Sequence, residues 1–349
     1  MKILIADFLF ANAHKNVNTN FINAISKFAE IDVISNNGFY DDQKDAFSNG
    51  SINLLNANVE QKKGAFGARL FSVELMKNAA AFAQKKDYDV VLSMGFETTF
   101  FKFGLSFFKN RPLFIFHHKN IDELTNKVKR MMFNRYKNRV YHVVFEDFFR
   151  DRLVTEIGVH SDKVFVIPHP VKRLEDVPTA KSYDCVGLCS SNDENFIQEA
   201  VNRECDFFKH DIHILLRSKT FEKKNGMVEV ITGFLEKEEY DSLMSAGKAV
   251  FVPLPETYIY RLSGSIYDAL SRGKVVYTTS KYYANEYGRR YPGTCMHVGS
   301  VEQLIERLKN QSNIETSTSF EKFNDSHSIE IVSREIESMI CRVLAVKKN

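Results

Sequence analysis

Residues 248–280 read KAVFVPLPETYIYRLSGSIYDALSRGKVVYTTS, and this stretch predicts a strand, a loop of small residues, a short helix and a second strand. Ser263, Gly264 and Ser265 form the loop, directly before the helical pattern IYDAL. Small side chains let backbone amides approach a ligand, and a helix start presents N–H groups that have no partner within the helix. The stretch therefore predicts an anion-binding turn, with Asp268 placed to accept hydrogen bonds from ribose hydroxyls. The alternative is a tight turn at Gly264, followed by an acid that favours the first turn of a helix.

The size and composition of the chain are those of a globular protein. Its 349 residues suit two domains of about 150 to 180 residues each. Hydrophobic residues make up 44% and charged residues 26%, and no apolar run approaches the roughly 20 residues that span a bilayer. The net charge of +3 is too small to indicate nucleic-acid binding. The first residues, MKILIADFLFANAH, have the pattern of a buried strand and lack a signal-peptide cleavage site, so we expect a cytoplasmic protein.

The cysteines are odd in number and lack the spacing of metal ligands. We therefore expect reduced, mostly buried thiols and no structural zinc. The five positions are Cys185, Cys189, Cys205, Cys295 and Cys341.

Two stretches allow contact with a membrane surface. Residues 127–139, KVKRMMFNRYKNR, surround Met and Phe with six basic side chains, and residues 96–108 contain many phenylalanines. This composition is typical of a basic amphipathic helix that lies on anionic lipid. A solvated helix whose Met and Phe side chains face the core explains the first stretch equally, and a buried helix explains the second.

Short apolar runs alternate with amphipathic stretches along the whole chain, which favours parallel sheets covered by helices on both faces. We expect helices near residues 19–28, 64–84, 98–108 and 122–136. Strands are expected near residues 3–6, 31–35, 90–94, 113–117, 140–145 and 164–167, and in the second half near 185–188, 212–216, 228–231, 249–253, 275–278 and 296–298.

The polar stretch 171–182, which follows the prolines of Pro168-His169-Pro170, is the best candidate for a linker. The predicted domains are therefore an N-terminal domain at 1–172 and a C-terminal domain at 173–327. A final helix at 328–349 is expected to pack back on the N-terminal domain.

Four strings in this order resemble the retaining nucleotide-sugar glycosyltransferases of the GT-B fold, the large "group 1" family, in a form met in surface-polysaccharide biosynthesis. They are PLFIFHHKNID at 112–122, HSDKVFVIPHPV at 160–171, EVITGFLEKEEYDSLMSAGKAVFVPLP at 229–255 and RLSGSIYDALSRGKVVYTT at 261–279. The resemblance covers nearly the whole chain. It implies an α/β protein made of two tandem Rossmann-like, doubly wound domains with a cleft between them. In this resemblance the N-terminal domain at 1–172 binds the acceptor and the C-terminal domain at 173–327 binds the nucleotide-sugar donor.

The resemblance also implies roles for residues of the second half. Asp268 matches the second carboxylate of the family's E-x7-E element, which holds the donor ribose, and Ser263, Gly264 and Ser265 match the loop that faces the pyrophosphate. The first glutamate of that element, which contacts the donor sugar in the family, falls at Tyr260, so the chain departs from the family pattern here. Glu256 is the nearest acid that can take its place. The Arg and Lys that usually follow the first strand of the second domain are missing from residues 187–192. The basic residues placed to neutralise the diphosphate instead are Arg261, Arg217 and Lys219.

In the first half, His118 matches a family histidine that touches the donor sugar, and Asn120 adds a hydrogen bond. A buried structural histidine is the alternative, and the alternation of side chains along a strand lets only one of His117 and His118 face a ligand. The loop 11–19 stands where the family has a glycine-rich loop. We assign it to acceptor selection and expect Asn18 to cap the helix that follows.

The implied activity is transfer of a sugar from a UDP- or GDP-sugar to a glycan or lipid-linked acceptor, with retention, without a metal and without a cofactor. Nucleic acid is not expected as a partner. Contact with an anionic membrane, at the inner face of the cell membrane, is expected. Two alternatives remain: a GT-B nucleotide-sugar 2-epimerase, and a non-catalytic subunit that binds a sugar nucleotide or polysaccharide.

Overall fold

The computed structural model describes residues 1–9, 14–47, 52–60, 63–108, 111–311 and 316–348. The chain forms two compact units, each built on one parallel sheet. The first unit contains Met1–Pro170, Tyr260–Leu262 and His327–Asn349, and the second contains Val171–Ile259 and Ser263–Ser326. The predicted fold class, two doubly wound α/β domains of Rossmann type, is confirmed.

The sheet of the first unit has seven parallel strands in the order β3-β2-β1-β4-β5-β6-β7. The order reverses between β1 and β4, so these two strands form the topological switch point of the unit. The strands are β1 (Lys2–Asp7), β2 (Glu30–Ser35), β3 (Ile52–Asn56), β4 (Val90–Gly95), β5 (Leu113–Phe116), β6 (Tyr141–Val144) and β7 (Val164–Val166).

The sequence analysis missed β3. Its residues, INLLN, form an edge strand, and their side chains are exposed or half-buried. The central strand β4 is buried at all six positions and is therefore a continuous apolar run that a sequence pattern detects easily. An edge strand with asparagine at both the second and fifth positions gives no such signal.

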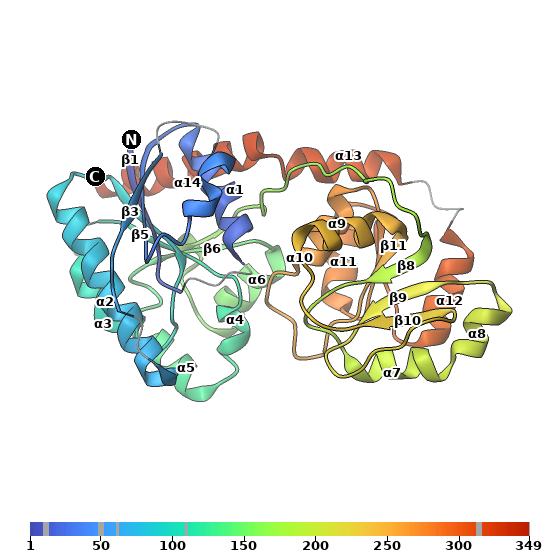
Figure 1. Cartoon of the computed structure of the whole chain (residues 1–349). Helices are drawn as coiled ribbons and strands as arrows, with labels where there is room; N and C mark the ends of the chain where they lie inside the picture. Colours follow the sequence, from blue (N-terminus) through green and yellow to red (C-terminus); the bar gives the residue numbers. More distant parts are fainter. Residues whose placement is uncertain (10–13, 48–51, 61–62, 109–110, 312–315, 349) are drawn as a thin grey trace. The chain divides into compact units, whose positions relative to one another are not determined.

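In the first unit, the C-terminal helix α14 packs against α1 (Figure 1). The predicted helix at 122–136 is interrupted: α4 ends at Glu123, and α5 begins after Asn126, whose side chain accepts the N–H groups of Val128 and Lys129. The helices are α1 (Lys15–Ser26), α2 (Gly64–Lys85), α3 (Phe101–Gly104), α4 (Asn120–Glu123), α5 (Lys127–Asn134), α6 (Asp147–Asp151) and α14 (Ile329–Lys348), with 3-10 turns at Asp41–Ala46, Leu105–Phe108 and Ser161–Lys163 and a π-helical turn at Arg152–Glu156.

The expected cap of α1 is wrong. The helix begins at Lys15, so Asn18 lies inside its first turn, where its side-chain amide donates to Asp7 at 3.1 Å and to Tyr40 at 3.2 Å. Asn18 is therefore a buried link between α1 and the end of β1. Residues 11–13 of the loop assigned to acceptor selection lie outside the described residues.

The sheet of the second unit has six parallel strands in the order β10-β9-β8-β11-β12-β13, all of which the sequence predicts. The order reverses between β8 and β11. The strands are β8 (Tyr183–Gly187), β9 (Ile214–Arg217), β10 (Val228–Ile231), β11 (Gly247–Val252), β12 (Val275–Thr278) and β13 (Cys295–His297); the helices are α7 (Glu194–Asn202), α8 (Glu204–Lys209), α9 (Lys237–Ala246), α10 (Gly264–Ser271), α11 (Lys281–Arg290), α12 (Val301–Lys309) and α13 (Ser317–Ser326).

Among the described residues, no helix is both long and apolar enough to cross a bilayer. All five cysteines are free thiols, of which Cys205 and Cys341 are exposed.

Candidate functional site

In the second unit, the switch point between β8 and β11 brings polar loops to one edge of the sheet. Parallel doubly wound sheets bind ligands at this place, outside the carboxyl ends of the strands. The loops after β8, β9 and β10 line a pocket of about 340 Å³. Its lining residues are Cys189, Ser190, Asn192, Arg217, Ser218, Lys219 and Gly233.

Two of the predicted cations, Arg217 and Lys219, lie in this pocket. The guanidinium of Arg217 donates to the carbonyl of Gly233 at 2.5 Å, which fixes it against the loop after β10. Lys219 is exposed, and its ammonium group forms no ion pair with a described residue. Asn192 donates to the main chain of Arg217, while its side-chain oxygen is buried without a hydrogen-bond partner among the described residues. The pocket thus offers a positive charge and an unused acceptor.

The start of α10 follows β11, on the other side of the same switch point. Ser263 is the N-cap residue and only 2% exposed, yet its hydroxyl caps no N–H group and has no hydrogen-bond partner among the described residues. Gly264 has no positive φ, and a Cβ built there would meet nothing within 4 Å. Internal packing therefore does not require the glycine, which leaves open space before the helix. The first turn contains no acid to offset the positive end of the helix dipole.

A side chain of α9 contacts the predicted ribose acceptor. The Ser265 side chain partly offsets the rise in pKa that burial gives to the Cys189 thiol and to the Tyr240 hydroxyl. The Tyr240 hydroxyl donates to the carboxylate of Asp268 at 3.1 Å. Burial raises the pKa of Asp268 from 3.8 to about 6, although the hydrogen bond from Tyr240 and the charge of Arg272 partly offset this effect. Asp268 is therefore an ionised acceptor at neutral pH and a neutral acid below pH 6.

Glu256, in contrast, lines a different pocket, of about 430 Å³, together with Tyr258, Lys281 and His297. This pocket lies beside the loop after β11 and the ends of β12 and β13, and none of the cations of the first pocket lines it. Of the predicted donor-site residues in this unit, Arg217 and Lys219 thus share one pocket, Asp268 pairs with Tyr240, and Glu256 lines a separate pocket.

In the first unit, His117 and His118 point in different directions, as expected from strand alternation. The ring of His117 pairs with that of His142 at 2.9 Å in the core. His118 is 3% exposed; its Nε2 lies 3.0 Å from the carbonyl oxygen of Met94, and its ring stacks on His14 with centroids 4.2 Å apart.

The protonation of His118 follows from these contacts. Burial, followed by the neighbouring His14, lowers its pKa well below 6.5, so the imidazole is neutral. A carbonyl oxygen only accepts hydrogen bonds, so Nε2 carries the proton and donates to Met94. The other nitrogen, Nδ1, is then an acceptor, and it has no hydrogen-bond partner among the described residues. Asn120 is more constrained, because its amide donates to Phe96 at 2.9 Å and to Thr98 at 3.0 Å.

Within the first unit, the carboxylate of Asp122 accepts hydrogen bonds from both Tyr260 and Arg261. The backbone N–H of Tyr260 donates to Asp122 at 2.7 Å, and the Nε of Arg261 donates to the same side chain at 2.6 Å. Leu262 adds a backbone bond to His118 at 3.2 Å. The side chain of Asp122 is 6% exposed and that of Arg261 is 37% exposed. Arg261 therefore has a partner for part of its charge.

The sequence analysis missed Tyr240, Asp122 and Cys189 as members of these arrangements. Tyr240 lies in the middle of a charged helix, and its pairing with Asp268 depends on the packing of α9. Asp122 lies four residues after His118 in the sequence, and no local pattern marks it as the partner of Arg261. One signal was available for Cys189, because it directly follows the apolar run of β8 at the expected switch point. Among the described residues, no group of three or more His, Cys, Asp or Glu side chains could hold a metal ion.

Comparison with known proteins identifies relatives in fold. No protein-family model and no curated protein sequence matches the chain. The crystal structure of HepE from Anabaena in complex with UDP and glucose superposes with a TM-score of 0.69 at 14% identity, covering 98% of this chain and 99% of that one. Sucrose-phosphate synthase from Thermosynechococcus elongatus gives 0.72 at 10% identity, covering 99% and 100%. UDP-N-acetylglucosamine 2-epimerase from Neisseria meningitidis, bound to UDP-GlcNAc, gives 0.61 at 12% identity, covering 98% and 100%. The chain therefore has the GT-B fold, which these proteins share.

Proposed function

We propose that this protein is a glycosyltransferase that moves a sugar from a UDP- or GDP-sugar to a glycan or lipid-linked acceptor, in the biosynthesis of surface polysaccharide or a related glycoconjugate. The observation that carries the proposal is the start of α10. A buried hydroxyl at Ser263 without a partner, open space before Gly264 and the acceptor Asp268 lie together at the switch point of a parallel sheet. HepE, which has the same fold, was crystallised with UDP-glucose.

In this proposal the donor binds along the edge of the second sheet. The diphosphate lies at the start of α10, where backbone N–H groups and the helix dipole favour negative charge. Asp268 accepts hydrogen bonds from the ribose hydroxyls. Lys219 and Arg217 supply positive charge beside the diphosphate, and their pocket has room for the base. These groups stabilise the nucleoside diphosphate as its negative charge grows in the transition state.

His118 serves as a positioning group in the reaction. Its neutral ring presents Nδ1 as an acceptor for a sugar hydroxyl, and Asn120 holds the loop beside it. Nδ1 is buried beneath neighbours that include the His14 ring, so ligand binding requires a side-chain movement there. We assign Arg261 to the departing diphosphate, with Asp122 as the group that orients its guanidinium.

The proposed chemistry is retention by front-face displacement. The bond between the anomeric carbon and the donor phosphate breaks as the acceptor oxygen attacks from the same face, and the departing phosphate takes the acceptor proton. Positioning and charge stabilisation then account for most of the rate enhancement. The fixed N–H groups and cations supply this stabilisation, so we propose that the reaction requires neither a metal nor a cofactor. Full activity in EDTA supports this point, and activity that returns only with Mg²⁺ or Mn²⁺ contradicts it.

The experiment that tests the transferase is release of nucleoside diphosphate from a panel of UDP- and GDP-sugars, measured with and without oligosaccharide and lipid-linked acceptors. We expect one donor to be turned over, with faster release when the correct acceptor is present. The anomeric configuration of the product, read by NMR, tests retention. Binding of a donor without release or transfer would instead indicate a non-catalytic subunit.

A second candidate is a nucleotide-sugar 2-epimerase, because the chain shares its fold with two such enzymes. That reaction needs acids and bases that converge on carbon 2 of the sugar. Incubation with UDP-N-acetylglucosamine distinguishes the two, because an epimerase forms the 2-epimer of the sugar without any acceptor. A transferase forms a glycosidic bond only when the acceptor is present.

We also propose that the first unit lies against an anionic membrane at the cytoplasmic face of the cell membrane. Phe66 of α2 and Phe103 of α3 are 62% and 51% exposed, and both rings contact Phe100, at 5.7 and 5.4 Å. The basic side chains beside them are Arg69, whose guanidinium lies 5.8 Å from the Phe100 ring, and Lys102.

Helix α5 presents a second apolar and basic surface. Met132 and Phe133 face the core, as one alternative of the sequence analysis expected. Val128 and Met131, however, are 59% and 49% exposed beside the exposed Lys127 and Arg130. Apolar side chains ringed by lysine and arginine favour the surface of a bilayer that contains anionic lipid.

Co-sedimentation with phosphatidylglycerol vesicles at low salt tests this contact. We expect binding that weakens in the double variant Phe103→Glu, Met131→Glu and in vesicles of phosphatidylcholine alone. Phe208→Glu is the matched control, because Phe208 is 73% exposed but lies on α8 of the second unit. Equal binding by all three proteins, or no binding to anionic vesicles, contradicts the proposal.

A further inference from the structure

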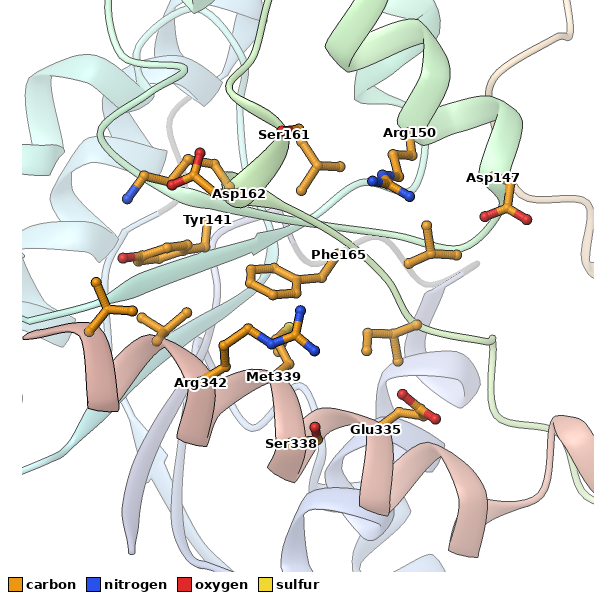
Figure 2. Close-up of a pocket in the computed structure, with 16 residues that line it drawn as sticks. Tyr141, Asp147, Arg150, Ser161, Asp162, Phe165, Glu335, Ser338, Met339 and Arg342 are labelled. Carbon is orange, nitrogen blue, oxygen red and sulfur yellow. The ribbon is translucent and has the colours of Figure 1, made fainter.

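The first unit contains a groove that belongs to none of the sites described above. It has a volume of about 450 Å³ and lies between strand β7 with its preceding turn on one side and helix α14 on the other (Figure 2). Aromatic side chains form its floor: the ring of Phe165 lies 6.2 Å from that of Tyr141, and Met339 and Val343 of α14 border them. None of its lining residues is proposed to bind the nucleotide sugar.

Strand β7 is the outermost strand of its sheet, so one side of its backbone has no neighbouring strand. It pairs in parallel with β6, in the register Val143 to Phe165 and Val144 to Val166, and the N–H of Ile167 donates to Val144. Hydrogen-bonding groups alternate between the two sides of a strand. The N–H and C=O of Val166 therefore point away from β6, and neither has a hydrogen-bond partner among the described residues.

Natural proteins usually blunt or cover a sheet edge, because its free backbone groups pair readily with another chain. Here α14 runs beside the edge without filling the space, as the groove itself shows (Figure 2). The lining residues of α14 extend from Glu335 to Val346, which corresponds to about 16 Å of helix. An extended peptide of roughly five residues spans this length.

The walls of the groove carry two arginines that form no ion pair with a described residue. Arg150 comes from α6 and Arg342 from α14, and Figure 2 shows both guanidinium groups pointing towards the middle of the groove. The guanidinium of Arg342 lies 5.9 Å from the centre of the Phe165 ring. The acids Asp147, Asp162 and Glu335 lie nearer the periphery of the groove (Figure 2). The centre of the groove thus presents positive charge above an aromatic surface.

We propose that this groove binds an extended segment of a partner protein, which adds to β7 as a further strand and carries an acidic side chain next to apolar ones. The main chain of the segment pairs with Val166, its acid contacts Arg150 and Arg342, and its apolar side chains pack on Phe165 and Met339. Strand addition of this kind gains affinity from backbone hydrogen bonds and specificity from side-chain pockets. The proposal goes beyond sugar transfer, since it concerns what the protein associates with.

The test is a selection of randomised nine-residue peptides displayed on phage, with the full chain as target. Enriched peptides are synthesised, and their affinities are measured by fluorescence anisotropy. The key variant is Val166→Pro, which removes an N–H that makes no hydrogen bond within the protein and is tolerated on an edge strand. Val166→Ala is the matched control, because it shortens the side chain and keeps the N–H. Arg150→Glu combined with Arg342→Glu tests the charge contact.

We expect peptides with an acid between apolar residues, whose affinity falls at least tenfold in Val166→Pro and in the double arginine variant and stays within threefold in Val166→Ala. Hydrogen exchange of the wild-type protein provides a second readout that does not depend on any variant: the bound peptide should slow exchange of the Val166 amide. A selection that yields no such sequence overturns the proposal. So do peptides that bind Val166→Pro as tightly as the wild type and leave exchange at Val166 unchanged, because these would use the arginines alone.

Discussion

Replacing Asp268 with asparagine is expected to stabilise the unliganded protein at neutral pH while it weakens nucleotide binding. The carboxyl group is buried enough that its pKa rises from 3.8 to about 6. The folded protein therefore binds the proton more tightly than the unfolded chain does, and its stability falls as the pH rises from about 4 to 6. Above pH 6 the folded state contains an ionised group in a poorly solvated place.

The size of the effect follows from the pKa. Each pKa unit corresponds to about 1.4 kcal/mol. The rise to about 6 therefore lowers the free energy of unfolding of the wild type by about 3 kcal/mol above pH 7 and leaves it unchanged below pH 4. Asparagine has nearly the same shape, carries no charge and keeps an oxygen that can accept the hydrogen bond from Tyr240. For a unit of this size, the gain corresponds to a rise in Tm on the order of 5–10 °C.

Thermal unfolding of wild type and Asp268→Asn between pH 4 and pH 8 measures this difference, and titration with the donor nucleotide measures binding. We expect the two unfolding curves to coincide near pH 4 and to separate as the pH rises, with the variant more stable at pH 8 and at least tenfold weaker in nucleotide binding. A variant that is less stable than the wild type at pH 8 refutes the reasoning, because the carboxylate would then be stabilised by its surroundings. A difference in Tm between the two proteins that is the same at every pH also refutes it, because the effect would then not depend on ionisation.

Three other substitutions test separate parts of the account. Asp122→Ala removes the partner of Arg261 and is expected to lower the free energy of unfolding by about 2 kcal/mol in urea titration, while an unchanged value would mean that the ion pair contributes nothing. His118→Phe is expected to lower kcat/KM at least tenfold and leave nucleotide affinity within twofold. Because burial holds the pKa of His118 well below 6.5, the pH profile of the wild-type kcat/KM should show no ionisation of this imidazole between pH 6 and 8. An ionisation that is present in the wild-type profile and missing from that of the variant would contradict the neutral state assigned to His118. Lys219→Ala is expected to weaken nucleotide binding about tenfold at low salt and less at 0.5 M salt, whereas a loss that is independent of salt would argue against a charge contact.

The sequence predicts a strand well wherever at least one of its positions is a buried apolar residue. All six strands of the second unit and six of the seven in the first meet this condition, including the partly buried edge strands β7, β10 and β13. The missed strand, β3, lies at an edge where its side chains contact solvent, and the break between α4 and α5 depends on a local cap by Asn126 that the helical pattern hides.

The candidate site could be predicted only in part, because a motif shows which residues lie close in sequence and not which carboxylates and hydroxyls pair. The residues around Ser263 were predicted because strand, loop and helix are consecutive in the chain. The pairing of Arg261 with Asp122, 139 residues apart, and of Asp268 with Tyr240, 28 residues apart, arises from tertiary packing. Single-sequence reasoning has no access to such contacts.

The most direct test of the central claim is isothermal titration of UDP- and GDP-sugars into the wild type, Asp268→Ala and Glu199→Ala, the last being an exposed acid on α7 of the same unit. The account predicts one donor that binds with a stoichiometry of one, binding that is lost in Asp268→Ala, and unchanged affinity in Glu199→Ala. Absence of binding by every nucleotide sugar, or equal binding by all three proteins, would contradict a nucleotide-sugar site at the start of α10.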